Sequence, residues 1–192
     1  RDARMTSAGV TLRVEAWMGS SGFSRMEFEL RGPDALQGAV VQYDIGPQAL
    51  RVSRPMAIAG ESEGVDVPND CVYLPLTRNF LGPVIAQIAA TDTGCAPVVV
   101  PDLRDPGSNT LFSPLVSMRT AAKVSGKSSA VSAAQRTWQT QCYQFVGGPY
   151  NDASAFWLCR RSHRLIRYCF STPQGESWLA ELVELVTKKP TR

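Results

Sequence analysis

The sequence contains a single histidine, His163, and no two cysteines in C-x-x-C spacing. A metal site built on several histidines is therefore excluded, and neither a thioredoxin-type redox motif nor a zinc ribbon is present. A zinc site would need at least three thiolates that converge, and no local pattern indicates one. We therefore expect no metal and no cofactor.

Long apolar runs and a large excess of one charge are also missing. No segment approaches the length of about 20 apolar residues that a membrane-spanning helix needs. The 20 basic and 17 acidic residues leave a net charge of +3, and the basic residues are scattered, which argues against a dedicated nucleic-acid-binding protein. The chain opens on Arg1-Asp2-Ala3-Arg4, and no apolar run follows that would indicate a signal peptide. If the numbering begins after processing, such a peptide has already been cleaved off.

With 192 residues, 44% of them apolar, the chain has the composition of one globular domain, which we expect to span residues 1–192. Apolar and polar residues alternate with a period of two in 10–17 and 23–30, around a turn at 19–22. Segments 40–45 and 50–57 continue the series. Successive strands joined by short turns predict an antiparallel sheet.

The middle of the chain changes character. Residues 60–70 are acidic and are expected to form a loop, and Ser125 to Ala134 is of low complexity, which indicates a loop or a weak helix. Apolar residues recur at helical spacing between these segments, and Pro83 suits only a first helical turn, so we expect a helix from about Gly82 to Ala90. Its apolar face would carry Phe80, Val84, Ile85 and Ile88.

The last third is rich in aromatic and β-favouring residues. Residues 137–146 read as a strand, and 155–160 and 165–170 as a hairpin around Arg161-Ser162-His163. Residues 178–187 fit either an amphipathic helix or a final strand. The predicted fold is thus mainly β (α+β), with one or two helices.

The five cysteines leave two alternatives open. Cys142 and Cys159 lie equally far from Tyr150-Asn151, so a hairpin with its tip there would place them opposite each other, near disulfide distance. Cys71 and Cys95 are the next candidate pair. The alternative is five buried free thiols, because cysteine is among the most buried residue types.

Two short motifs resemble catalytic signatures. Gly60 to Gly64 matches G-x-S-x-G, and a serine hydrolase would rest on Ser62 and His163, but no helix follows Ser62 as a nucleophile elbow requires. Ala121 to Ser128 resembles a relaxed phosphate loop, but it lacks the parallel strand–loop–helix context that this loop needs. We interpret both segments as loops and assign no catalytic residue.

Two groups of residues late in the chain could bind a ligand. The first is a cationic set around the hairpin turn, which could hold a phosphate or an acidic head group: Arg160, Arg161, His163, Arg164 and Arg167. The second is a set of aromatic residues that could line an apolar cavity: Trp138, Tyr143, Phe145, Phe156, Trp157, Tyr168, Phe170 and Trp178. The alternatives without a ligand are a solvent-exposed hairpin for the cationic set and an ordinary hydrophobic core for the aromatic set.

The late segments resemble a known family. Thr137 to Val146 (TWQTQCYQFV), Ala155 to Leu158 (AFWL), Arg164 to Tyr168 (RLIRY) and Gly175 to Leu179 (GESWL) resemble the strand run of the LolA-like and LppX-like lipid and lipoprotein carriers of the bacterial envelope. Residues 159–163 replace the acid and glycine of that family's usual turn. The resemblance implies a curved antiparallel sheet, an unclosed half-barrel, with helices on its concave face. It implies no enzymatic activity.

These observations lead to one functional hypothesis and two alternatives. We expect the chain to bind or carry a lipid or another hydrophobic ligand in the periplasm or another exported location, with a lipoprotein or membrane surface as a further partner and no nucleic acid. The ligand would lie between the sheet and the 82–90 helix, because a strand such as 156–160, with bulk on both faces, must be covered on both. The alternatives are an interaction module with a filled core and, less favoured, a serine hydrolase.

Overall fold

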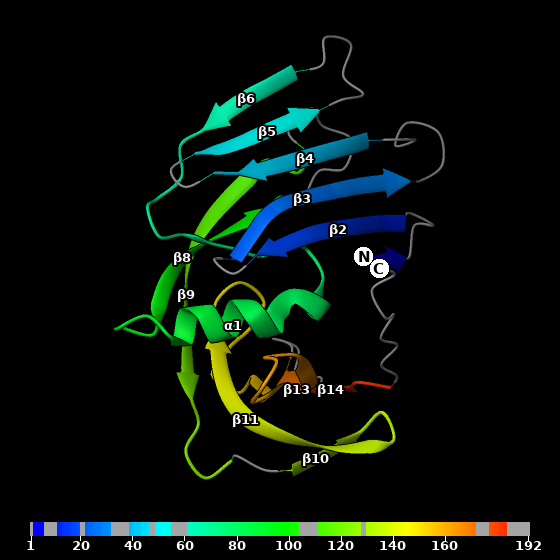
Figure 1. Ribbon diagram of the computed structural model, residues 1–192, viewed down its shortest axis with the longest axis vertical. Coiled ribbons are helices and arrows are strands. Elements are labelled where there is room, and N and C mark those ends of the chain that lie inside the picture. The colour runs from blue at the N-terminus through cyan, green and yellow to red at the C-terminus, as the bar shows by residue number, and fades with distance from the viewer. Residues whose placement is uncertain are drawn as a thin grey trace, which may run out of the picture. The chain divides into compact units, whose positions relative to one another are not determined.

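Figure 1 shows the computed structural model of the chain, which describes residues 2–5, 11–19, 22–31, 39–46, 49–54, 61–103, 111–127, 130–171 and 177–183. The chain divides into two compact units, each made of two segments. Unit 1 comprises Arg1–Phe80 and Ala96–Met118, and unit 2 comprises Leu81–Cys95 and Arg119–Arg192.

Strands dominate the described residues, and α1 is the single α-helix among them. The sheets are largely antiparallel and are not closed into a barrel, so the predicted fold class is confirmed. The strands are β1 (Asp2–Met5), β2 (Thr11–Gly19), β3 (Gly22–Arg31), β4 (Ala39–Ile45), β5 (Leu50–Arg54), β6 (Glu61–Val65), β7 (Val72–Tyr73), β8 (Cys95–Pro101), β9 (Pro114–Lys123), β10 (Ala130–Ala133), β11 (Arg136–Val146), β12 (Ala155–Cys159), β13 (Leu165–Ser171) and β14 (Ser177–Glu181). The helices are η2 (Arg78–Phe80), a 3-10 helix, and α1 (Leu81–Ala89).

Unit 1 contains a six-stranded antiparallel sheet, β1 to β6, in which neighbouring strands follow one another in the chain. The period-two alternation of the sequence turns one face of this sheet into the core, which includes the fully buried Leu12, Phe28 and Tyr43. The same unit also holds β7 and, from Ala96 on, β8, and these two strands pair in parallel.

A buried hydrogen bond lies within this core. The hydroxyl of Tyr43 donates a hydrogen bond to the carbonyl oxygen of Phe112, whose ring lies 5.3 Å from that of Phe28. Burial raises the pKa of Tyr43 well above its ordinary value, so the phenol keeps the proton that it donates. The one buried hydroxyl of this aromatic cluster is therefore satisfied.

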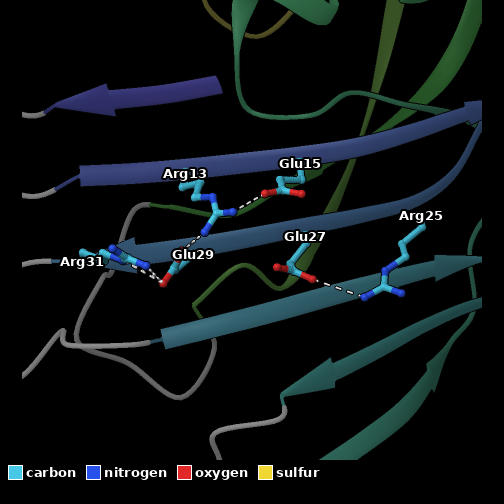
Figure 2. Close-up of polar contacts among 6 residues, drawn as sticks. All are labelled: Arg13, Glu15, Arg25, Glu27, Glu29 and Arg31. Carbon is cyan, nitrogen blue, oxygen red and sulfur yellow. Dashed lines mark hydrogen bonds and ion pairs between the residues drawn. The ribbon is translucent and has the colours of Figure 1, made fainter. Parts of the chain in front are cut away.

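The opposite face of β2 and β3 carries a ladder of ion pairs, drawn in Figure 2. Glu15 and Glu27 are directly opposite each other, which alone would be repulsive. Arg13 contacts Glu15 and also donates to Glu29 at 3.1 Å, while Arg25 lies 3.3 Å from Glu27. Each carboxylate of the ladder therefore has a guanidinium beside it.

Glu29 lies between Arg13 and Arg31, and we expect it to make the stability of unit 1 depend on pH. Partial burial alone would raise its pKa, but hydrogen bonds from Arg31 and Arg13 lower it below the ordinary 4.5. A lowered pKa stabilises the fold above the unfolded value, and this contribution is lost as the pH falls through the folded value. Glu29→Gln should therefore cost about 0.5–1 kcal/mol in urea denaturation at pH 7 and almost nothing at pH 3.

Glu63→Gln is the matched control, because Glu63 is more exposed and, among the described residues, has one ion pair, with Arg54 at 3.0 Å. Its cost should stay below about 0.5 kcal/mol at pH 7. An equal loss for Glu29→Gln at both pH values would contradict the ion-pair explanation.

In unit 2, β11 is the central strand, and it bends strongly along its length (Figure 1). It pairs with β12 and with the second half of β9, and β10 pairs with its beginning. β13 and β14 continue the antiparallel order beyond β12, so β14 lies at the edge of the sheet. The strand alternative for the C-terminal segment is thus the correct one over Ser177–Glu181.

The helix α1 of unit 2 begins close to the predicted position and packs tightly at its first turn. A Cβ atom on Gly82 would lie 2.1 Å from the carbonyl oxygen of His163 and 2.9 Å from the backbone nitrogen of Leu165. Only glycine allows this approach. The side chains of Val84, Ile85 and Ile88 are fully buried, as their helical spacing predicts.

Two segments that we expected to be loops form strands. Residues 61–65 form β6, whose small and polar residues pair in register with β5, and 130–133 form β10, which pairs with β11. In both cases pairing with a neighbouring strand outweighs a weak local preference. The last residues predicted in the fourth strand, 55–57, lie outside the described residues. No described helix is long and apolar enough to cross a membrane.

Candidate functional site

A pocket of about 240 Å³ lies in unit 2, where β11 and β12 meet the turn that leads into β13. It is lined by Lys123, Gln141, Tyr143, Leu158, Cys159, Arg160 and His163. Lys123 is directly opposite Tyr143, and Gln141 is directly opposite Leu158, so these four residues share one face of the sheet. The pocket therefore combines one face of the sheet with the adjoining turn.

The β12–β13 turn is held by backbone hydrogen bonds. The amide of Cys159 donates to the carbonyl oxygen of Arg164 at 2.8 Å, and the amide of His163 donates to that of Cys159 at 2.9 Å. His163 closes the turn with a φ of 52°, a conformation that histidine adopts more readily than bulky residues do. The amide of Arg160 donates to Gln139 at 2.9 Å, and its side-chain Nε donates to Thr140 at 3.1 Å.

The charged side chains described around this pocket are basic. Lys123 and Arg160 are cationic, His163 adds an imidazole N–H, and the described lining contains no carboxylate. Tyr143 adds a hydroxyl, and burial raises its pKa, so the phenol stays protonated. The pocket thus offers hydrogen-bond donors to an anion.

The structure divides the predicted cationic set. Arg160 and His163 line the pocket, whereas Arg161 is exposed on the turn and Arg164 lies beside Cys159. Arg167 forms an ion pair with Glu181 of β14, with 2.5 Å between Nε and Oε1. Lys123 and Gln141 were not predicted, because only the pairing of β9, β11 and β12 brings them to this turn.

Six residues of unit 2 form an aromatic row on the same sheet face as the pocket. Phe156 is directly opposite Tyr168, and Phe170 is directly opposite Trp178. The successive rings from Phe156 to Trp178 are nearly parallel, with centroids 6.0, 6.1 and 6.5 Å apart. The row consists of Phe145, Tyr150, Phe156, Tyr168, Phe170 and Trp178. It runs from fully buried rings to Trp178, which is 53% exposed.

Two of the predicted aromatic residues belong to the other face of this sheet. Trp138 packs with Val131, Ala133 and Ile166, and Trp157 packs against the same cluster. The indole of Trp138 donates to the carbonyl oxygen of Ala133 at 2.9 Å. Unit 2 therefore has an apolar cluster on one side of its sheet and the aromatic row on the other.

Phe80 precedes α1 and lies in η2, in unit 1. Its ring packs edge-on against that of Phe23 at 5.8 Å. It is thus not part of the apolar face of α1, which retains Val84, Ile85 and Ile88.

All five cysteines are free, so the predicted disulfides are wrong. The register between β11 and β12 places Cys159 opposite Thr140 and Cys142 opposite Trp157. The connection contains two turns in succession, in which Gly147 bridges Tyr150 and Ser154 donates to Asn151. The pairing is therefore not centred on Tyr150-Asn151, and the two cysteines are offset along the strands.

We expect Cys159 to be alkylated before the buried Cys142. Desolvation raises the pKa of both thiols, but at Cys159 hydrogen bonds from Ser162 and Arg161 and the charge of Arg164 outweigh it and lower the pKa. Iodoacetamide labelling at neutral pH, read by peptide mass spectrometry, measures the order. Ser162→Ala should slow labelling of Cys159 roughly two- to fivefold.

Ser132→Ala is the control, since Ser132 is an exposed residue of β10. It should leave the labelling rate of Cys159 unchanged. Faster labelling of Cys142 than of Cys159 would contradict the prediction.

The two catalytic-looking motifs lie in sheet and turn structure. Ser62 is within β6 and lies 3.2 Å from the hydroxyl of Ser53 on β5, so it is not at a strand-to-helix turn. Ala121 to Lys123 belong to β9, and Gly126 lies in the turn after it, with β10 next in the chain. Ser128 lies outside the described residues.

Comparison with known proteins gives no relative: no family model, curated protein or solved structure matches the chain.

Proposed function

We propose that this protein binds and carries a lipid or another hydrophobic ligand without chemically changing it. The observation that carries the proposal is the aromatic row, which connects the fully buried Phe156 to the half-exposed Trp178 on an edge strand. The exposed end of this row, at Trp178, offers an acyl chain apolar surface that can be reached from solvent and that continues into buried rings. Exposed apolar surface of this kind is typical of binding sites. The proposed setting, the bacterial envelope, rests on the family resemblance.

One observation favours the second candidate, an interaction module with a filled core. Val84, Ile85 and Ile88 have no exposed surface, as expected if α1 packs on protein alone. The two candidates differ in whether the apolar space beside α1 can admit a ligand, and mutations at α1 and at Trp178 separate them.

Trp178→Ala tests the exposed end of the row. We expect the parent protein to bind a fluorescent fatty-acid analogue and the variant to bind it about fivefold or more weakly, because a large apolar contact is lost. Trp17→Ala is the matched control, since Trp17 is 42% exposed but lies in unit 1, and it should leave binding unchanged. Failure of the parent to bind the analogue would contradict the proposal.

Ile85→Trp tests the space beside α1. If a ligand enters there, the larger side chain should block uptake while the melting temperature stays nearly unchanged. In a filled core the same change should cost about 1–3 kcal/mol through overpacking. Strong destabilisation, together with no probe binding by the parent, would favour the interaction module. Native mass spectrometry of the purified parent would reveal a lipid that co-purifies.

A further inference from the structure

We infer that the pocket at the β12–β13 turn binds an anionic phosphate group. The phosphate would be either the head group of an amphipathic ligand or a free ion. The head-group version rests on the proposed function, because it takes the apolar part of the ligand to lie along the aromatic row. The binding of phosphate itself does not depend on that assumption.

The charge arrangement of the pocket is the first argument. Lys123, Arg160 and His163 come from the end of β9, the end of β12 and the turn, and the fold brings them to one concave site. Among the residues that the structure describes, the lining holds basic and neutral side chains. A lysine and an arginine that converge on one hollow, with the imidazole of His163 beside them, suit phosphate recognition.

Preorganisation of the donors is the second argument. The Nε atom of Arg160 donates to the carbonyl oxygen of Thr140, which orients the planar guanidinium. The backbone of His163 is held by its amide hydrogen bond to Cys159 and by the close packing of Gly82 against its carbonyl oxygen, which fixes the point from which its side chain extends. A donor that is already oriented loses less conformational entropy when an anion binds.

The size of the pocket and its position indicate what part of a ligand it takes. Its volume of about 240 Å³ is smaller than the 300–1,000 Å³ typical of pockets that enclose a whole small-molecule ligand, so it suits a head group. Its apolar wall consists of Tyr143 and Leu158. Tyr143 is directly opposite Phe156, a buried member of the aromatic row, so the head-group site adjoins this row.

The test compares two soluble ligands with the same acyl chains. Dihexanoyl phosphatidic acid carries the phosphate, dihexanoylglycerol lacks it, and inorganic phosphate is the third probe. All three are measured by titration calorimetry near 0.15 M ionic strength, where the Debye length is about 8 Å. We expect the phosphate to improve affinity of the parent about tenfold over the glycerol ligand, as charge-assisted hydrogen bonds do.

Arg160→Gln and Lys123→Gln should each reduce phosphatidic acid binding about five- to tenfold and leave dihexanoylglycerol binding unchanged. The matched controls are Arg161→Gln, in the same turn, and Lys127→Gln, in the connection after β9, because both residues are exposed and lie outside the lining. The controls should change affinity less than about twofold. Melting temperatures identify any variant that fails to fold, and the other pocket variant then carries the test.

The outcomes separate this inference from the proposed function. Equal affinity for the two acyl ligands, or an equal loss in Arg160→Gln and Arg161→Gln, would overturn the phosphate pocket while leaving lipid binding intact. Binding of inorganic phosphate that Arg160→Gln abolishes, with no binding of dihexanoylglycerol, would support the pocket and contradict lipid carriage. If the parent binds none of the three probes, both ideas fail.

Discussion

Gly82→Ala is expected to destabilise the protein by about 3 kcal/mol, although alanine is the better helix former. The added Cβ would lie 2.1 Å from the carbonyl oxygen of His163 and 2.9 Å from the nitrogen of Leu165. These are backbone atoms of the β12–β13 turn and of the first residue of β13, so neither can move away without disturbing that hairpin. The variant should lower the melting temperature and the urea midpoint.

Gly64→Ala is the control for this prediction. A Cβ at Gly64, on β6, meets no atom within 4 Å. Its effect should stay within about 0.5 kcal/mol. If Gly82→Ala were as mild, then α1 would not be held against the turn, and the preorganisation of His163 would need another explanation.

Phe156→Ala is expected to cost about 3–5 kcal/mol. Phe156 is fully buried, and its ring packs against Phe145 at 5.8 Å, Tyr150 at 5.2 Å and Tyr168 at 6.0 Å. Its loss would leave a cavity in the middle of the aromatic row, and the neighbouring strands are hydrogen-bonded too firmly to close it. Urea denaturation measures the free energy, and near-ultraviolet circular dichroism reports the loss of aromatic packing.

Trp178→Ala provides the comparison at the other end of the row. Trp178 is 53% exposed on the edge strand, so its removal should cost less than about 1 kcal/mol. Similar costs for the two variants would mean that the two ends of the row do not differ in burial. That result would remove the support for lipid binding.

The sheet structure could be predicted because local pattern and tertiary pairing agree there. The alternation in residues 10–17 and 23–30 reflects a sheet with one buried face, and both segments form strands of unit 1. The start of α1 could be predicted because Pro83 is tolerated only in a first helical turn. Where composition alone was the guide, as at 61–65 and 130–133, the prediction of loops was wrong, because pairing with a neighbouring strand decides the structure of such segments.

The candidate site could be predicted only in part, because it depends on register. Arg160 and His163 were found since they are neighbours in the sequence, but Lys123 reaches the pocket through its pairing opposite Tyr143. A shift of two residues between β11 and β12 likewise separates Cys142 from the position opposite Cys159. Register follows from turn geometry and packing together, and a single sequence does not contain either explicitly.

The interleaving of the two units imposes an order on biosynthesis. The segment Leu81–Cys95 belongs to unit 2, yet it is encoded between the two segments of unit 1. A chain that emerges from the ribosome N-terminus first can complete unit 1 once residue 118 is free, whereas α1 must wait for the β12–β13 turn to be translated. A single proteolytic cut between residues 80 and 81 would keep α1 with the rest of unit 2, but it would also separate residues 96–118 from the first segment of unit 1.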